Sequence, residues 1–306
     1  MTARVASQAS AQRQRDEAVE WMNRGQRQTQ ENAKEAFYCY TKAIQLLFGL
    51  DRSDHPDWSN SLGAAFMNRG RIRHQLEGIE SAAAVEADYV EAEAVLAEVS
   101  DHEYPWVLRN RAGVSVNRSN LLLGLNQSWS ARYYGIQAVR TLEPLLPSED
   151  VVDFQLYLLA KRSLCDALGQ LLPMMDQAEF ATRLAHEAGD HVDDALILIR
   201  QWRVNGEEPF SELSLRFFRF GAELYGRHQP QFLIEFLDDH FVGLKDKTVE
   251  ISMTEIALES IVIAMTQLSG RVYELSGNLD VMDRARDLMA LLLEAHERYQ
   301  LRKGIA

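Results

Sequence analysis

The chain contains little cysteine and little proline, and it has no long apolar run. Cys39 and Cys165 are its only cysteines, which excludes a disulfide framework or a cysteine-based metal cluster. We expect both thiols to be buried as small hydrophobic groups in a reduced, cytoplasmic setting. Only seven prolines occur in 306 residues, so long stretches can remain helical.

The net charge and the short apolar runs argue against a membrane or nucleic acid as the partner. Purely apolar runs such as residues 290–293 fall far short of the about 20 residues that a membrane-spanning helix needs. Residues 1–15 are polar and lack the apolar core of a signal peptide. The formal net charge is −13, which repels a phosphate backbone on average. We therefore expect a cytoplasmic protein that binds neither a membrane nor nucleic acid.

Apolar residues recur every three or four positions almost throughout the chain, and strict alternation is almost absent. This period predicts an all-α protein. Proline and glycine then separate about twelve helices joined by short turns, which suggests six antiparallel pairs. The expected helices are 12–29, 32–49, 57–77, 88–100, 105–125, 128–146, 150–171, 176–202, 210–227, 230–242, 249–275 and 278–302.

A short motif occurs three times in the first half of the chain. Residues 21–25 read Trp-Met-Asn-Arg-Gly, residues 66–70 read Phe-Met-Asn-Arg-Gly, and residues 115–119 read Ser-Val-Asn-Arg-Ser. Such recurrence indicates a repeat in which each helix pair buries its apolar face on its neighbours. The last residue of each copy is small. We expect these residues, Gly25, Gly70 and Ser119, to lie where paired helices approach most closely.

Each copy resembles the first helix of a tetratricopeptide repeat (TPR). That family places a large residue, then Asn, then a small residue on the first helix, and follows them with Ala, an aromatic residue and Ala on the second helix. The residues that match the second-helix pattern are Ala36, Tyr40 and Ala43 after Gly25, Ala92 and Leu96 after Gly70, and Ala131 and Ala138 after Ser119. An extra stretch near residues 74–83 departs from the family.

The resemblance covers about residues 15–146. It implies an α-solenoid of antiparallel helix pairs, a TPR-like superhelix whose first helices build a concave face. It also implies a scaffold that binds a protein or peptide, without catalysis and without a cofactor. We expect a flexible tail over 1–11, TPR-like repeats over 12–149, and degenerate repeats or a helical cap, continuous with the first part, over 150–306.

The asparagines of the motif are the candidate ligand-binding residues. Asn23, Asn68 and Asn117 fall where TPR proteins point side chains into the concave groove, and an amide can bond a ligand backbone through both its oxygen and its nitrogen. The alternative is that each asparagine braces a neighbouring helix. Helical spacing places further residues on the same surface, namely Met22, Gln26, Met67, Arg71, His74, Gln75, Val116 and Asn120.

Some TPR proteins grip a peptide's terminal carboxylate with five conserved positions. The matching positions here are Met22, Gln26, Asn68, Gly113 and Asn117, and only Asn68 fits, so we do not expect that clamp. Arginines give the first half a basic tendency, and we expect them to pair with acids of adjacent helices rather than with ligand. They are Arg24, Arg69, Arg71, Arg73, Arg109, Arg111, Arg118 and Arg132.

Two alternatives to a scaffold remain. The first is an enzyme with a metal site between His186 and Asp194. His186 and His191 are five residues apart, so they diverge on a helix unless Gly189 breaks it, and a solvated acidic helix end is the simpler interpretation. The second is a structural homo-oligomer assembled through the C-terminal helices. Gly-rich phosphate loops, nucleophile elbows and Cys-x-x-Cys pairs are absent from the sequence.

Overall fold

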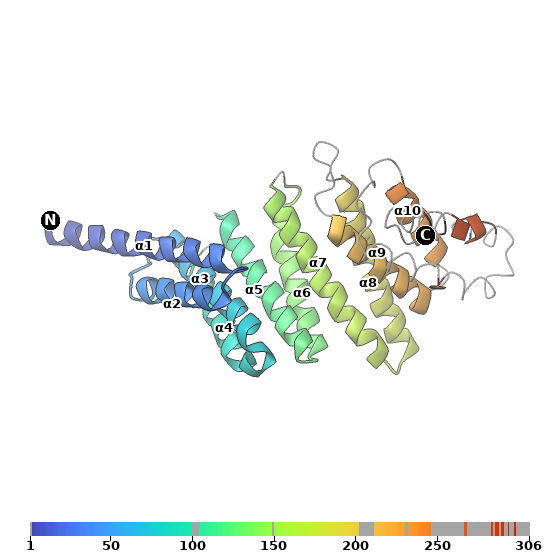
Figure 1. Ribbon diagram of the computed structural model, residues 1–306, viewed down its shortest axis with the longest axis horizontal. Helices are drawn as coiled ribbons and strands as arrows, with labels where there is room; N and C mark the ends of the chain where they lie inside the picture. Colours follow the sequence, from blue (N-terminus) through green and yellow to red (C-terminus); the bar gives the residue numbers. More distant parts are fainter. Residues whose placement is uncertain are drawn as a thin grey trace. The chain divides into compact units, whose positions relative to one another are not determined.

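The computed structural model describes residues 2–99, 104–148, 150–201, 211–229 and 232–245, together with ten single or grouped positions between 266 and 297 (266, 267, 283, 285–287, 289, 290, 293 and 297). Over these residues every regular element is helical, with ten α-helices and three short 3₁₀ turns (Figure 1). The expected all-α class is therefore confirmed for the described part of the chain. The expected helices at 249–275 and 278–302 lie almost wholly outside the described residues.

The chain divides into two compact units, residues 1–164 and 165–306. The first unit holds three helix pairs. Helix α1 (Thr2–Gln28) packs against α2 (Ala33–Phe48), α3 (Pro56–Glu77) against α4 (Ala82–Ala97), and α5 (Pro105–Gly124) against α6 (Ser128–Leu142).

Neighbouring pairs of the first unit also contact one another. Helix α3 touches both α1 and α2, and α5 touches both α3 and α4. The labels of these helices follow one another from blue to green in Figure 1. Helices α1, α3 and α5 therefore succeed each other through direct contacts, with α3 in the middle.

The second unit contains α8 (Ala178–Gln201), α9 (Ser211–His228) and α10 (Leu233–Lys245). Helix α9 packs against both α8 and α10. Helix α7 (Val151–Leu171) begins in the first unit and ends in the second.

Local signals explain several of the helix ends. Pro56 and Pro105 occupy the first positions of α3 and α5, where a missing N–H costs nothing. The side chain of Asn32 caps α2 by accepting a hydrogen bond of 3.1 Å from the backbone N–H of Glu35. Gly78 ends α3 with a φ of 64°, in the region that favours glycine.

Two boundaries differ from the expected ones. Helix α1 begins at Thr2, so the segment expected as a tail over residues 1–11 is helical. This segment lacks an apolar period, but four of its eleven residues are alanine and it contains no proline or glycine. Helix α4 begins at Ala82 rather than at residue 88, and the expected inserted stretch consists of the end of α3, a 3₁₀ turn (Gly78–Ser81) and the start of α4.

The core of the first unit runs through α1 to α5. Its fully buried members include Leu47, Leu62, Tyr89, Leu96 and Val114. Cys39 and Cys165 are both free and buried, as expected. Burial and the neighbouring carboxylate of Glu35 raise the pKa of the Cys39 thiol, which keeps it in the unreactive protonated form.

Candidate binding surface

The small residue of each motif lies against the second helix of its pair. A Cβ atom added to Gly25 would lie 3.1 Å from the ring of Tyr40, and one added to Gly70 would lie 2.8 Å from the ring of Tyr89. In the third copy the hydroxyl of Ser119 donates a 2.9 Å hydrogen bond to the carbonyl of Ala131. The expected close approach is therefore present in all three pairs.

The arginines of the first two motifs bond across to an acid of the paired second helix. Arg24 pairs with Glu35 at 2.6 Å, and Arg69 pairs with the buried carboxylate of Asp88. Arg24 and Arg69 also lie over the aromatic rings three residues earlier, at 5.3 and 5.2 Å from the ring centroids. These cation–π contacts fix the guanidinium groups against their own helices.

The third motif arginine, Arg118, is buried and is held by two acids of the preceding helix pair, Glu86 and Glu93. It lies 4.1 Å from the ring centroid of Tyr134. Three further arginines bond within the chain: Arg73 to Asp88, Arg109 to Asp150 and Asp153, and Arg111 to the carbonyls of Leu96 and Val99. The expected pairing with acids is thus confirmed for Arg24, Arg69, Arg73, Arg109 and Arg118. It is wrong for Arg71, which forms no ion pair within the described residues.

The asparagines of the motif differ from the arginines in their hydrogen bonding. Asn23 is exposed, and Asn68 and Asn117 are half-buried. None of the three side chains forms a hydrogen bond to another residue in the part of the chain that the structure describes. The alternative in which they brace neighbouring helices therefore has no hydrogen bond to support it.

The other candidate residues on the first helices differ in exposure and in contacts. Gln26 is exposed, whereas Met22 and Met67 are partly buried against the core. The sulfur of Met67 lies 2.9 Å from the position of a Cβ atom on Gly113, so α3 and α5 approach closely there. Asn120 accepts a 2.6 Å hydrogen bond from Ser163 on α7.

Val116 does not line the surface as expected. Only 8% of it is exposed, because this side of α5 faces the interior. Arg71, His74 and Gln75 remain accessible on α3, Arg71 and His74 as half-buried residues and Gln75 as an exposed one. Asn23, Gln26, Asn68, Arg71 and Asn117 are called the amide face below.

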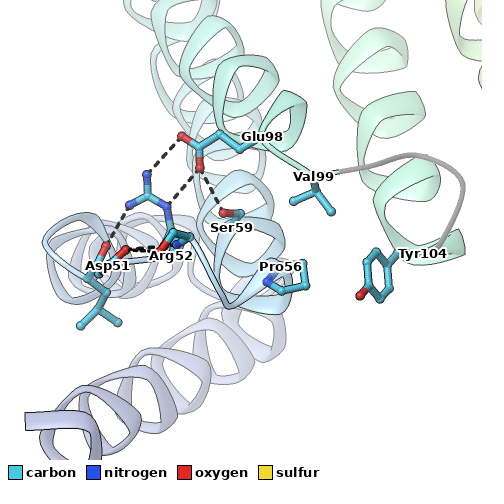
Figure 2. Close-up of a pocket in the computed structure, with 9 residues that line it drawn as sticks. Asp51, Arg52, Pro56, Ser59, Glu98, Val99 and Tyr104 are labelled. Carbon is cyan, nitrogen blue, oxygen red and sulfur yellow. Dashed lines mark hydrogen bonds and ion pairs between the residues drawn. The ribbon is translucent and has the colours of Figure 1, made fainter. Parts of the chain in front are cut away.

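A separate cavity of about 550 Å³ lies where the end of α2 meets the start of α3 and the end of α4. Figure 2 shows the polar side chains on one side of it turned toward one another. Glu98 accepts bonds from Arg52 at 3.3 and 3.4 Å and from Ser59 at 3.1 Å. Arg52, Ser59 and Glu98 thus bond one another at the wall of the cavity.

The stretch from His186 to Asp194 forms part of a continuous helix, because α8 runs through Gly189 without a break. His186 is exposed and its ring bonds the carbonyl of Thr182 at 2.9 Å. Within the described ranges, no group of three or more His, Cys, Asp and Glu residues is arranged to hold a metal ion.

A partly buried polar network in the second unit was not predicted from the sequence. Tyr225 donates a 2.6 Å hydrogen bond to Asp193, and Nε2 of His240 lies 2.9 Å from the same carboxylate. Arg200 approaches Nδ1 of His240 at 2.9 Å. Arginine can only donate, so Nδ1 accepts and the proton of the neutral ring resides on Nε2, facing Asp193.

Burial and the carboxylate of Asp193 raise the pKa of Tyr225, which keeps the phenol a donor. The network joins α8, α9 and α10, and each group has its partner. In the sequence, Asp193 lies in the stretch considered as a metal site, but its spacing does not indicate Tyr225 or His240 as partners. In the structure, a Cβ on Gly189 would lie 2.6 Å from the Tyr225 hydroxyl. The arrangement is that of a satisfied structural network, with no unpaired group left for a substrate.

Comparison with known proteins adds no assignment. A scan against protein-family models and a search of curated proteins both give no match. No helix in the described part of the chain is long and apolar enough to cross a membrane. The described part of the chain is thus all-helical, with three helix pairs in the first unit.

Proposed function

We propose that this protein is a non-catalytic scaffold that binds a protein or peptide segment on the amide face. One observation carries the proposal. The arginine of each motif is bound inside the chain, whereas the asparagine directly before it bonds to no described residue.

The chemistry of the amide suits an extended or helical peptide. A peptide backbone presents an N–H donor and a carbonyl acceptor at each residue, and a primary amide offers both complements at once. A half-buried amide without a partner leaves hydrogen-bonding capacity unused in a partly desolvated place. A ligand backbone would satisfy Asn68 and Asn117 without disturbing any existing bond.

We also propose that the helix pairs of the first unit form a TPR-like repeat, of which the amide face is the concave side. Support comes from the glycine–tyrosine contacts of the first two pairs and from the succession of α1, α3 and α5 through direct contacts. A cytoplasmic location is part of the same proposal. Its support is the presence of two free, buried cysteines without a disulfide between them.

A display library of short random peptides tests the binding proposal on the full chain. We expect the wild-type protein to enrich peptides, and we expect Asn68→Ala with Asn117→Ala to lose that enrichment at an unchanged melting temperature. Each lost hydrogen bond is worth about 0.5–1.5 kcal/mol, so two cost the complex roughly one to two orders of magnitude in affinity.

The control replaces Gln137 and Arg140 by Ala on α6, away from the amide face. Peptides that bind the double asparagine variant as well as the wild type would refute the proposal. A double variant that melts much earlier than the wild type would show that the asparagines support the fold instead.

A further inference from the structure

Arg71 is the exception among the arginines of α3. Its neighbours Arg69 and Arg73 both pair with Asp88. Arg71 is half-buried, yet it forms no hydrogen bond or ion pair within the described residues. Leaving a partly desolvated guanidinium without an acceptor is unfavourable, so an acceptor from outside the chain would gain from this site.

No carboxylate of the described residues lies within ion-pair distance of Arg71. Burial raises the pKa of the Tyr40 and Tyr89 phenols, and the charge of Arg71 lowers both, so the guanidinium lies near the two rings. The acids that also act on Tyr89 are Asp88 and Glu86. Both are already bound by other arginines. Arg71 is thus a cation without an ion-pair partner among the described residues.

We propose that the segment bound on the amide face carries an Asp or Glu side chain whose carboxylate binds the guanidinium fork of Arg71; this inference rests on the proposed function. The planar fork matches a carboxylate with two parallel hydrogen bonds. One cation balances a carboxylate, whereas a phosphate at neutral pH carries about −1.5 to −2 charges and would need a second.

The position of Arg71 favours an acid inside the segment over one at its end. Arg71 lies on α3, which contacts both α1 and α5. Amides stand on each of these flanking helices, with Gln26 on α1 and Asn117 on α5. A segment that uses amides of all three helices passes Arg71 partway along its length, where a side chain and not a terminus is available.

The experiment pans the short-peptide library against full-length wild type, Arg71→Gln and the control Arg140→Gln, an exposed arginine of α6. We expect wild type and the control to enrich peptides with an internal Asp or Glu, and Arg71→Gln to enrich peptides without that preference. In a selected peptide, replacing this acid by its amide should weaken wild-type binding about tenfold and leave binding by Arg71→Gln unchanged.

The outcomes separate the two proposals. An equal acid preference in wild type and Arg71→Gln, or no acid preference in the wild type, overturns this inference while the amide face stands. A preference for phosphorylated or C-terminal groups over internal acids also overturns it. Absence of any enrichment by the wild type overturns both the inference and the proposed function.

Discussion

Both units of the chain contain a close contact between a glycine and a tyrosine, but the polar groups beside the contact differ. In the first unit, Gly70 lies against Tyr89, and the charge beside this contact is carried by the arginine–aspartate pairs of α3 and α4. In the second unit, Gly189 lies against Tyr225, and the tyrosine hydroxyl itself enters a bonded network with Asp193.

The difference shows which part of the repeated motif serves packing. The glycine–tyrosine contact occurs in both units, although the Asn-Arg motif occurs only in the first. Close helix pairing at a glycine–tyrosine contact therefore does not require the Asn-Arg motif. The arginines of the first two motifs add ion pairs to the second helix, whereas the motif asparagines form no hydrogen bond to a described residue.

The largest effect that we expect tests the arginine pairs. Asp88→Ala removes a carboxylate that is 3% exposed and is shared by Arg69 and Arg73. Losing one partner of a buried pair typically costs about 3–5 kcal/mol. Urea unfolding followed by circular dichroism measures it, with Glu91→Ala, an exposed residue of the same helix, as a control that changes stability by less than about 0.5 kcal/mol. Equal midpoints for the two variants would mean that the pairs contribute little.

The next effect tests the packing that the units share. A methyl group on Gly70 or on Gly189 must displace a tyrosine, and overpacking of this kind costs about 1–3 kcal/mol. We expect Gly70→Ala and Gly189→Ala to lower the unfolding midpoint, and Gly49→Ala to leave it nearly unchanged, because nothing lies within 4 Å of a Cβ there. If only Gly70→Ala is destabilising, the two contacts are not equivalent.

A smaller difference in stability is expected between variants of Tyr225 and Tyr89. Tyr225→Phe removes a 2.6 Å hydrogen bond to Asp193 and should cost about 1 kcal/mol. Tyr89→Phe removes a hydroxyl that makes no hydrogen bond to a described residue and should cost less than about 0.5 kcal/mol. The same urea experiment compares them, and a reversed order would contradict the contrast between the units.

The pH dependence of Tyr225 follows from its raised pKa. The folded chain keeps this phenol protonated at a pH where tyrosine in the unfolded chain, with a pKa of about 10, has ionised. Protons are thus bound more tightly in the folded state, and stability that is complete below about pH 10 falls as the pH rises further. We expect Tyr225→Phe to lose less stability than the wild type between pH 9 and 11. An equal loss would place the alkaline sensitivity elsewhere.

Much of the first unit could be predicted from its sequence. Pro56 and Pro105 mark helix starts, and glycine or serine in the recurring motif marks the close contacts. Such signals are local, because they depend on backbone geometry and on the absence of a side chain. The start of α1 could not be predicted from an apolar period, because an alanine-rich segment forms helix by propensity alone.

The polar partnerships could not be predicted from the sequence. Arg69, Arg71 and Arg73 alternate along α3, and only the position of Asp88 on α4 decides that the outer two are paired. Likewise Asp193, Tyr225 and His240 come from three helices and meet only through tertiary packing. Spacing in one sequence shows which residues share a helix face, but it does not show which of them a neighbouring helix satisfies.

Two asparagines of α3 test the central claim, that the amide face is free for a ligand while its surroundings hold the fold. Asn60 accepts a 2.7 Å hydrogen bond from Asn110 on α5, whereas Asn68 bonds to no described residue. The measurement is the melting temperature and the affinity for one library-selected peptide, in Asn60→Ala and in Asn68→Ala. We predict that Asn60→Ala melts earlier and keeps its affinity, whereas Asn68→Ala melts like the wild type and binds several-fold more weakly. If Asn68→Ala lowers stability and leaves affinity intact, the account is contradicted.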